Sequence, residues 1–158
     1  MVKVEDIEKS FGTQTVLKNV SFEVSEGESV AIIGRSGTGK SVLIKHLVGL
    51  LHPDAGGVFI EGENLMGMTE RQLLKVRYKF GMLFQGAALF DSMNVFENIA
   101  FPLRRSGIDD ETEISDSVEE VLNLVELPGV GSKMPSELSG GQQKRVGLAR
   151  AIVLHPKI

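Results

Sequence analysis

Residues 34–41 read Gly-Arg-Ser-Gly-Thr-Gly-Lys-Ser, a spacing of glycines, lysine and hydroxyl suited to binding linked phosphates. Backbone N–H groups in a glycine-rich loop can converge on phosphate oxygens, and a following helix adds partial positive charge at its N-terminus. The alternative is a chance glycine turn between a strand and a helix. We expect this loop to bind a triphosphate through Gly34, Arg35, Ser36, Gly37, Thr38, Gly39, Lys40 and Ser41, with Lys40 on the β- and γ-phosphates and Ser41 on Mg²⁺.

A second glycine pair, in Leu138-Ser139-Gly140-Gly141-Gln142, directly precedes a predicted helix. The glycines would expose backbone N–H groups, and the Ser139 hydroxyl can donate to a phosphate oxygen. The other interpretation is an ordinary helix start with Ser139 as its N-cap. Two glycines in a first turn cost stability, about 1 kcal/mol each. This cost favours a functional reason for the two glycines. Phosphate binding and an ordinary capped helix start both remain as interpretations.

The elements around these residues are predicted from apolar patterning. Residues 2–24 are expected to form strands, with period-two alternation over 20–24. The apolar run 30–33 predicts a buried parallel strand, followed by the glycine loop and a helix over 42–48. A short strand is expected at 58–60. The order strand, loop, helix is the context that a phosphate-binding loop requires.

Helices dominate the prediction for the rest of the chain. A capping box from Thr69 to Gln72 opens a helix through Val76, and 80–84 is expected to be a buried strand. Residues 92–127 are predicted to be helical, and a last helix is expected from about Ser139 to Val153. One predicted helix buries an apolar face formed by Ile114, Val118, Val121, Leu122 and Val125.

Bulk composition restricts the class of protein. The 158 residues contain no cysteine and carry a formal net charge of −4. These values exclude a disulfide framework and a thiolate zinc site, and argue against a dedicated nucleic-acid-binding protein. No apolar stretch reaches the roughly 20 residues that span a bilayer, and no signal peptide is evident. We expect a cytoplasmic protein that partners no nucleic acid and reaches a membrane only through other subunits.

Taken together, the two glycine motifs resemble those of the ABC-transporter ATPases. Leu138–Gln142 matches the family's signature sequence, and Phe84-Gln85 resembles its Q-loop. Phe11 stands where the family places the aromatic residue that stacks on adenine. The resemblance extends over all 158 residues and implies a P-loop NTPase (RecA-like) α/β core with an antiparallel β lobe and a helical lobe.

The resemblance also implies roles for individual residues. Lys40, Gln85 and Ser139 would be catalytic, and Ser41 and Gln85 would serve the Mg²⁺ ion. ATP would be sandwiched between two copies of the ATPase arranged head to tail, with Ser139, Gly140, Gly141 and Gln142 on the γ-phosphate of the other copy. Phe11 could instead be a core aromatic at a strand end, and Gln85 a solvated polar residue.

A more specific resemblance involves residues 86–103. They resemble the corresponding part of the ATPase subunits of Mla-type phospholipid transporters, which serve outer-membrane lipid asymmetry and solvent tolerance. In the family this region lies beside the groove that receives the coupling helix of the transmembrane permease subunit. The apolar residues of this stretch could equally be helical core.

The resemblance ends before several family elements. The family continues into a strand ending in Asp-Glu and then a switch histidine, and neither follows Pro156-Lys157-Ile158. We therefore expect the chain to be a fragment of a longer protein. The chain alone is expected to bind nucleotide weakly at best and to hydrolyse it very slowly.

The predicted organisation is one incomplete nucleotide-binding domain over 1–158. A β lobe and P-loop core would occupy about 1–87, a helical lobe about 88–140, and the signature helix about 140–155. We expect an ATP-hydrolysing subunit that energises transport through separate membrane subunits, with phospholipid as cargo. The alternatives are a non-transport ABC protein acting on ribosomes or DNA, and a truncated nucleotide-binding fragment that does not hydrolyse ATP.

Overall fold

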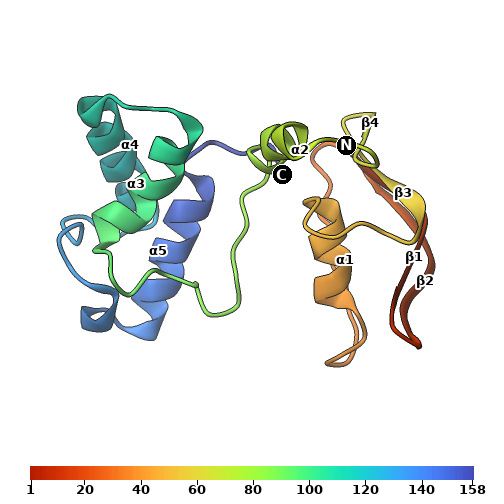
Figure 1. Cartoon of the computed structure of the whole chain (residues 1–158). Helices are drawn as coiled ribbons and strands as arrows, with labels where there is room; N and C mark the ends of the chain where they lie inside the picture. Colours follow the sequence, from red (N-terminus) through yellow and green to blue (C-terminus); the bar gives the residue numbers. More distant parts are fainter. The chain divides into compact units, whose positions relative to one another are not determined.

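The computed structural model describes all 158 residues, which divide into two compact units, 1–77 and 78–158 (Figure 1). The first unit contains β1 (Val2–Phe11), β2 (Gln14–Val24), α1 (Lys40–Leu47), β3 (Ala55–Ile60), β4 (Glu63–Asn64) and α2 (Glu70–Arg77). The second contains α3 (Val95–Ser106), α4 (Glu111–Leu124), the 3-10 helix η1 (Pro135–Glu137) and α5 (Gly140–Ile152).

The sheet of the first unit is antiparallel throughout, with strand order β2-β1-β3-β4. Val4 of β1 lies opposite Phe22 on one side and Val58 on the other. Along 20–24 in β2 partly buried and exposed residues alternate, so one face of this strand is covered. The predicted strands within 2–24 and at 58–60 are confirmed.

Helix α1 contributes buried residues to the core of this unit. Its Leu43 and His46 are buried, and His46 Nδ1 lies 2.7 Å from the carbonyl oxygen of Val42. Arg77, at the end of α2, donates to the carbonyls of Val48 and Gly49 just after α1. The start of α2 is closed by the Gln72 carboxamide, which accepts from the N–H and hydroxyl of Thr69. The two helices predicted for this unit are therefore present.

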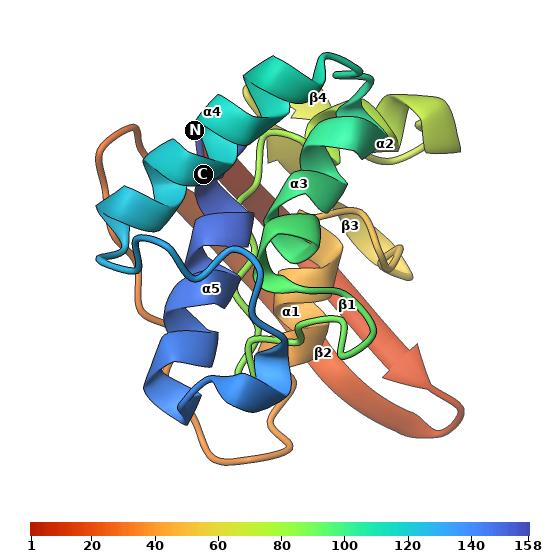
Figure 2. The same ribbon diagram turned by 90° about the vertical axis from the view of Figure 1, so that its left-hand side faces the viewer.

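Three helices form the core of the second unit (Figure 2). The buried face predicted for α4 is confirmed, since Ile114, Val118, Val121, Leu122 and Val125 are all at most 6% exposed. Asp110 caps α4 by accepting from the N–H groups of Thr112 and Glu113. From α3, Val95, Ile99 and Leu103 pack into the same cluster, with Val146 and Ala149 from α5.

Two predicted strands are absent. Residues 30–33 and 80–84 have no strand assignment, and Ile33 is 92% exposed. A parallel strand is stable only when neighbouring strands satisfy its backbone groups, and 30–33 pairs with none of the four strands. In the other stretch, Gly81 donates to Ile158 O, while Leu83 and Phe84 are about half exposed. Apolar runs alone therefore predicted the wrong secondary structure here.

Candidate functional site

Residues 34–39 fold into a loop in which the carbonyls of Gly34 and Arg35 face the Lys40 ammonium at the start of α1. Lys40 Nζ donates to the carbonyl oxygens of Gly34 and Arg35, at 2.7 Å in both cases. Thr38 Oγ1 also donates to Arg35 O, at 2.9 Å. None of the N–H groups of residues 35–37 donates to an acceptor within the chain. A cation thus lies beside a row of unpaired donors, which is the arrangement that an anion needs.

Helix α1 begins at Lys40, directly after this loop. Its N-cap, Gly39, has φ 93° and offers no side-chain cap. The first N–H groups of an α-helix have no partner within the helix, so those of α1 are also available. No acidic residue occupies the first turn of α1, and the partial positive charge of the helix end is therefore not neutralised locally.

Gly39 also fixes the loop against the sheet. A Cβ at this position would lie 2.8 Å from Val16 Cγ1 and 3.2 Å from the backbone oxygen of Val16. Both the positive φ and this close approach require glycine. The contact places the glycine loop against β2, next to the hairpin that joins β1 and β2.

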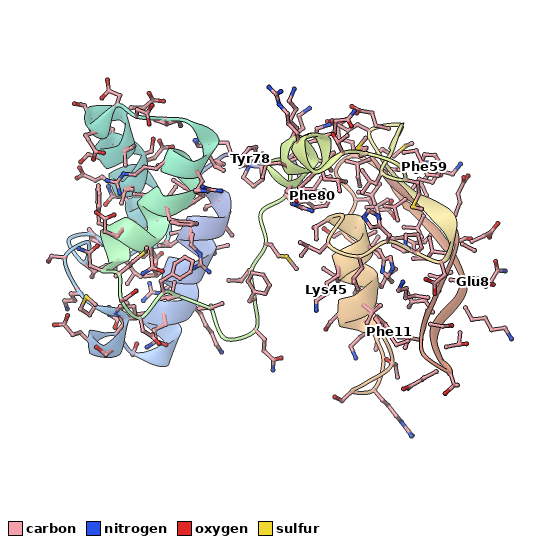
Figure 3. The ribbon with its side chains drawn as sticks, viewed as in Figure 1. Glu8, Phe11, Lys45, Phe59, Tyr78 and Phe80 are labelled. Atoms are coloured by element: carbon pink, nitrogen blue, oxygen red, sulfur yellow. The ribbon has the colours of Figure 1, made fainter.

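Phe11 lies at the end of that hairpin, where it pairs with Gln14 (Figure 3). Its side chain is 46% exposed, so it is not a core aromatic residue. The Lys9 ammonium lies 5.6 Å from the centre of the Phe11 ring. Asp54 accepts from Lys9 Nζ and from the N–H of Ser10, both at 2.7 Å. These bonds, the one from Lys9 first, hold the pKa of Asp54 below its usual value.

The signature segment, Leu138–Gln142, forms the start of α5 in the second unit. Ser139 is the N-cap: its Oγ accepts from Gln142 N–H at 3.3 Å, and its N–H donates to Gln142 Oε1 at 2.9 Å. This is a capping box, the arrangement described by the ordinary-helix interpretation. A Cβ added at Gly140 or Gly141 would meet nothing within 4 Å. Packing within the chain therefore gives no reason for these two glycines.

Gln85 lies in an exposed turn of the second unit, and the residues after it are firmly held. Ala87 and Ala88 have φ values of 61° and 49°. Their carbonyl oxygens accept from the Arg150 guanidinium at 2.7 and 2.9 Å. Further along, buried Asn98 accepts from the N–H of Phe90 and donates to its carbonyl.

Residues 86–103 are partly core and partly surface. Val95, Ile99, Ala100 and Leu103 are buried in the helical cluster. Phe90 and Phe101 are 42% and 39% exposed, and their ring centres lie 5.1 Å apart. The stretch therefore contributes an exposed aromatic pair in addition to buried helix residues.

Sequence reasoning missed the residues that hold these segments in place. Asp54 and Lys9 orient the hairpin that carries Phe11, Asn98 fixes the segment from Phe90 to Asn94, and Arg150 holds Ala87 and Ala88. Their partners are almost all backbone atoms or residues far along the chain. The one signal in the sequence that could have pointed to such a role is Asn98, a polar residue on the helix face that carries Val95 and Ile99.

No group of three His, Cys, Asp or Glu side chains that could hold a metal ion is present in the 158 residues. No helix combines the length and apolar character needed to cross a bilayer. A metal at the glycine loop would therefore depend on the hydroxyl of Ser41, which is exposed in the first turn of α1.

Comparison with known proteins agrees with this geometry. A family model described as "ABC transporter" matches residues 17–158. A "probable ribonucleotide transport ATP-binding protein mkl" from Mycobacterium leprae is 46% identical over 157 residues, covering 99% of this chain and 45% of the relative. The chloroplastic protein TRIGALACTOSYLDIACYLGLYCEROL 3 of Arabidopsis thaliana is 44% identical over 153 residues, covering 97% of this chain and 44% of the relative.

Among solved structures, the ATP-binding cassette MJ0796, seen as a dimer in a post-hydrolysis state with ADP and Pi, is similar with a TM-score of 0.88. The two chains are 34% identical, and the match covers 99% of this chain and 71% of the cassette. The fold class expected from the sequence is thereby confirmed. The chain spans less than half the length of the curated relatives described above.

Proposed function

This chain belongs to the ABC transporter family, and on that premise we propose that the full-length protein is an ATP-hydrolysing subunit that drives transport through separate membrane subunits. The observation that carries the proposal is the glycine loop. Lys40 lies beside unpaired N–H groups, and the uncapped start of α1 adds further donors. A nucleotide triphosphate supplies the matching row of anionic oxygens.

ATP binding would rearrange Lys40. In this structure its ammonium is held by two carbonyl oxygens, which are neutral acceptors. The charged oxygens of the β- and γ-phosphates are stronger acceptors for an ammonium group. Lys40 would exchange one set of bonds for the other, and the loop residues Gly34–Ser41 would line the phosphates.

Ser41 fits a magnesium ion in the way expected of such a site. Mg²⁺ prefers hard oxygen ligands and keeps several waters, so one hydroxyl together with phosphate oxygens is sufficient. When bound, Mg²⁺ neutralises charge that develops on the phosphoryl group during transfer. Ser41 would present its hydroxyl from the first turn of α1. To Gln85 we assign a separate role, that of orienting the attacking water or contacting the ion.

Phe11 would bind the base of the nucleotide. Its exposed ring lies at the end of the hairpin whose neighbouring residue Val16 contacts Gly39. An exposed aromatic face beside a phosphate-binding loop can stack on adenine. Lys9, held by Asp54, keeps this end of the hairpin in place.

A second copy of the chain would complete the site. The two glycines of the signature segment leave open space at the start of α5, although each costs about 1 kcal/mol in a helix. Close approach of a phosphate to the backbone explains that cost. Ser139 and Gln142, now bonded to each other, would turn to the γ-phosphate held by the other copy.

The membrane subunits would contact the second unit near the exposed pair Phe90 and Phe101, and the protein would be peripheral on the cytoplasmic side.

We propose a phospholipid as cargo and an Mla-type system. Two lines support this: residues 86–103 resemble that subgroup, and the name of the Arabidopsis relative contains that of a glycerolipid. The lobe boundaries near residues 87 and 140 are part of the same proposal.

The proposal is tested with the full-length protein purified together with its membrane subunits. We expect Mg²⁺-dependent hydrolysis of ATP, and ATP-dependent transfer of a fluorescent phospholipid between vesicles. Hydrolysis accompanied by uptake of a ribonucleotide instead would reject the lipid cargo alone. No hydrolysis by the wild-type complex would reject the proposed function.

A further inference from the structure

Arg150 makes contacts that the proposed nucleotide chemistry does not use. It lies in the last turn of α5, one helix turn after Gly147, and no carboxylate pairs with it. Its guanidinium donates instead to the carbonyl oxygens of Ala87 and Ala88, at 2.7 and 2.9 Å. Burial lowers the pKa of Arg150, yet a guanidinium stays ionised at neutral pH.

The two acceptor residues have an unfavourable backbone conformation. Ala87 and Ala88 both lie in the left-handed region, with φ 61° and 49°. Residues with a Cβ avoid this region because the Cβ approaches the carbonyl oxygen, and two in succession are uncommon. Something else in the structure must therefore hold this turn.

Helix α5 provides that hold at two points on one face. A Cβ at Gly147 would lie 2.9 Å from Ala87 Cβ, so the alanine fits only because this helix position has no side chain. Three residues later, on the same side of the helix, Arg150 closes over the turn. Its guanidinium carbon also lies 5.7 Å from the centre of the Phe90 ring.

The held turn begins two residues after Gln85. Before it, Phe84 is 48% exposed and Gly86 has open space around its Cα. After it, Asn98 fixes Phe90 through two hydrogen bonds. Phe84 O accepts from the N–H of Ala87 at 3.0 Å, so Gln85 and Gly86 form an exposed turn whose far end, residues 87–90, is fixed to α3 and α5. We name residues 84–90 the Gln85 loop.

We propose that Arg150 is a positioning residue for Gln85. Its two carbonyl bonds keep Ala87 and Ala88 in their strained conformation and so fix the position of the preceding residues, including Gln85. Because α5 starts at the signature segment, a shift of this helix is transmitted to the Gln85 loop through Arg150. This inference rests on the proposed role of Gln85 in hydrolysis.

The chain offers a matched control. Arg145 lies on the same helix and also donates to two carbonyl oxygens, those of Val125 and Glu126, at 3.1 and 3.2 Å. Glu126 has φ 58°, so this arginine too holds a left-handed turn. That turn lies between α4 and η1, on a different loop from Gln85.

The test compares Arg150→Met with Arg145→Met in the full-length protein, by amide hydrogen exchange without nucleotide and by steady-state ATP hydrolysis with the membrane subunits. Methionine keeps a long apolar stem and removes all donors. Arg150→Met is expected to speed exchange of the amides in 86–91 at least about tenfold, since two charge-assisted bonds are lost. It should lower kcat and leave KM for ATP within about twofold. Arg145→Met should change neither 86–91 nor kcat.

A rescue variant separates positioning from general stability. Ala88 is exposed, and glycine adopts a left-handed conformation without the steric cost. Ala88→Gly should therefore restore part of the kcat lost in Arg150→Met. Added to Arg145→Met, it should leave kcat unchanged. If Arg150→Met fails to fold, Arg150→Lys, which can make one of the two bonds, should speed exchange of the amides in 86–91 relative to wild type, whereas Arg145→Lys should not.

Three results would overturn the inference: unchanged exchange at 86–91 in Arg150→Met, an equal loss of kcat in Arg145→Met, or rescue of both arginine variants by Ala88→Gly. Failure of the wild-type complex to hydrolyse ATP would instead reject the proposed function. In that case the exchange data alone still decide whether Arg150 holds the turn.

Discussion

At the scale of residues, the side chains that we assign to nucleotide binding form hydrogen bonds to neutral groups of the chain. Lys40 is bonded to neutral carbonyls, and Ser139 and Gln142 are bonded to each other. Such bonds are weaker than those to a charged phosphate oxygen. The residues that we assign to nucleotide binding would therefore exchange partners, while Asp54, Asn98 and Arg150 would keep theirs.

Asp54 gives the structure a dependence on pH. Lys9 and the Ser10 N–H lower its pKa in the folded state, so its ionised form stabilises the fold above the unfolded pKa of about 4. That contribution is lost as the pH falls through the lower, folded pKa. Asp54→Asn should lower Tm slightly at pH 7, and the difference from wild type should shrink below about pH 4. Thermal unfolding at several pH values tests this, with exposed Asp116→Asn as control. A difference that does not change with pH would contradict it.

Few of the supporting residues could be identified from the sequence. The glycine loop, Phe11, Gln85 and the signature segment have recognisable patterns, and each was predicted by residue number. Lys9 and Asp54 meet across a long stretch of chain, and Arg150 reaches carbonyls more than sixty positions earlier. Hydrogen bonds to backbone atoms leave no pattern of side-chain types, so only the folded chain reveals them.

At the scale of elements, one glycine packs the glycine loop against the sheet, and two others form the start of α5. Gly39 lies against β2 with a positive φ, whereas Gly140 and Gly141 have neither a positive φ nor close neighbours. The first kind of glycine is required by the fold. The second kind costs helix stability, and packing within the chain gives no reason for it.

Gly39→Ala should therefore destabilise the protein by about 2–4 kcal/mol, because a left-handed alanine costs about 1–2 kcal/mol and the Cβ also collides with Val16. Gly12 provides the control, since it has φ 59° and a Cβ added there would meet nothing within 4 Å. Gly12→Ala should cost only the backbone part. Urea unfolding of both variants measures the difference, and equal losses would show that the contact with Val16 is unimportant.

The opposite result is expected at the signature segment. Gly140→Ala and Gly141→Ala should each raise the free energy of unfolding, by up to about 1 kcal/mol. The same variants should lower ATP hydrolysis by the full-length complex at least about tenfold, because a methyl group would block close approach of a phosphate. A variant that is stabilised and fully active would refute the assigned role of these glycines.

Helices were predicted better than strands for a physical reason. A helix satisfies its backbone groups internally, so the apolar face of α4 was sufficient to predict it. A strand depends on its neighbours, and the strand patterns of β1–β3 predicted them correctly because these strands pair within one antiparallel sheet. Residues 30–33 and 80–84 have the composition of buried strands but no partners here, so the pattern was misleading.

At the scale of the whole molecule, the proposed site requires two copies of the protein. Each copy would provide a glycine loop for one nucleotide and a signature segment for the other. The dimeric cassette MJ0796, bound to ADP and Pi, is a structural neighbour over 99% of this chain. Association should then depend on ATP, because in this proposal the phosphate would be a ligand of both surfaces.

ATP should convert the full-length protein from monomer to dimer in sedimentation experiments under conditions of slow hydrolysis. Ser139→Ala should weaken this dimer at least about fivefold by removing a phosphate ligand. The variant also loses a helix cap, which costs about 1 kcal/mol. Asp110→Ala removes the cap of α4 at a similar cost and is the matched control. Equal weakening by both variants would mean that only helix stability matters.

The central claim is that the glycine loop binds Mg·ATP, and calorimetric titration of the full-length protein tests it most directly. Lys40→Ala is compared with Lys45→Ala, which removes the same charge from an exposed position of the same helix. We expect Lys40→Ala to weaken binding roughly ten- to a hundredfold, since a charge-assisted bond to phosphate is lost. Lys45→Ala should bind like wild type. Equal affinities for wild type and Lys40→Ala would contradict the claim.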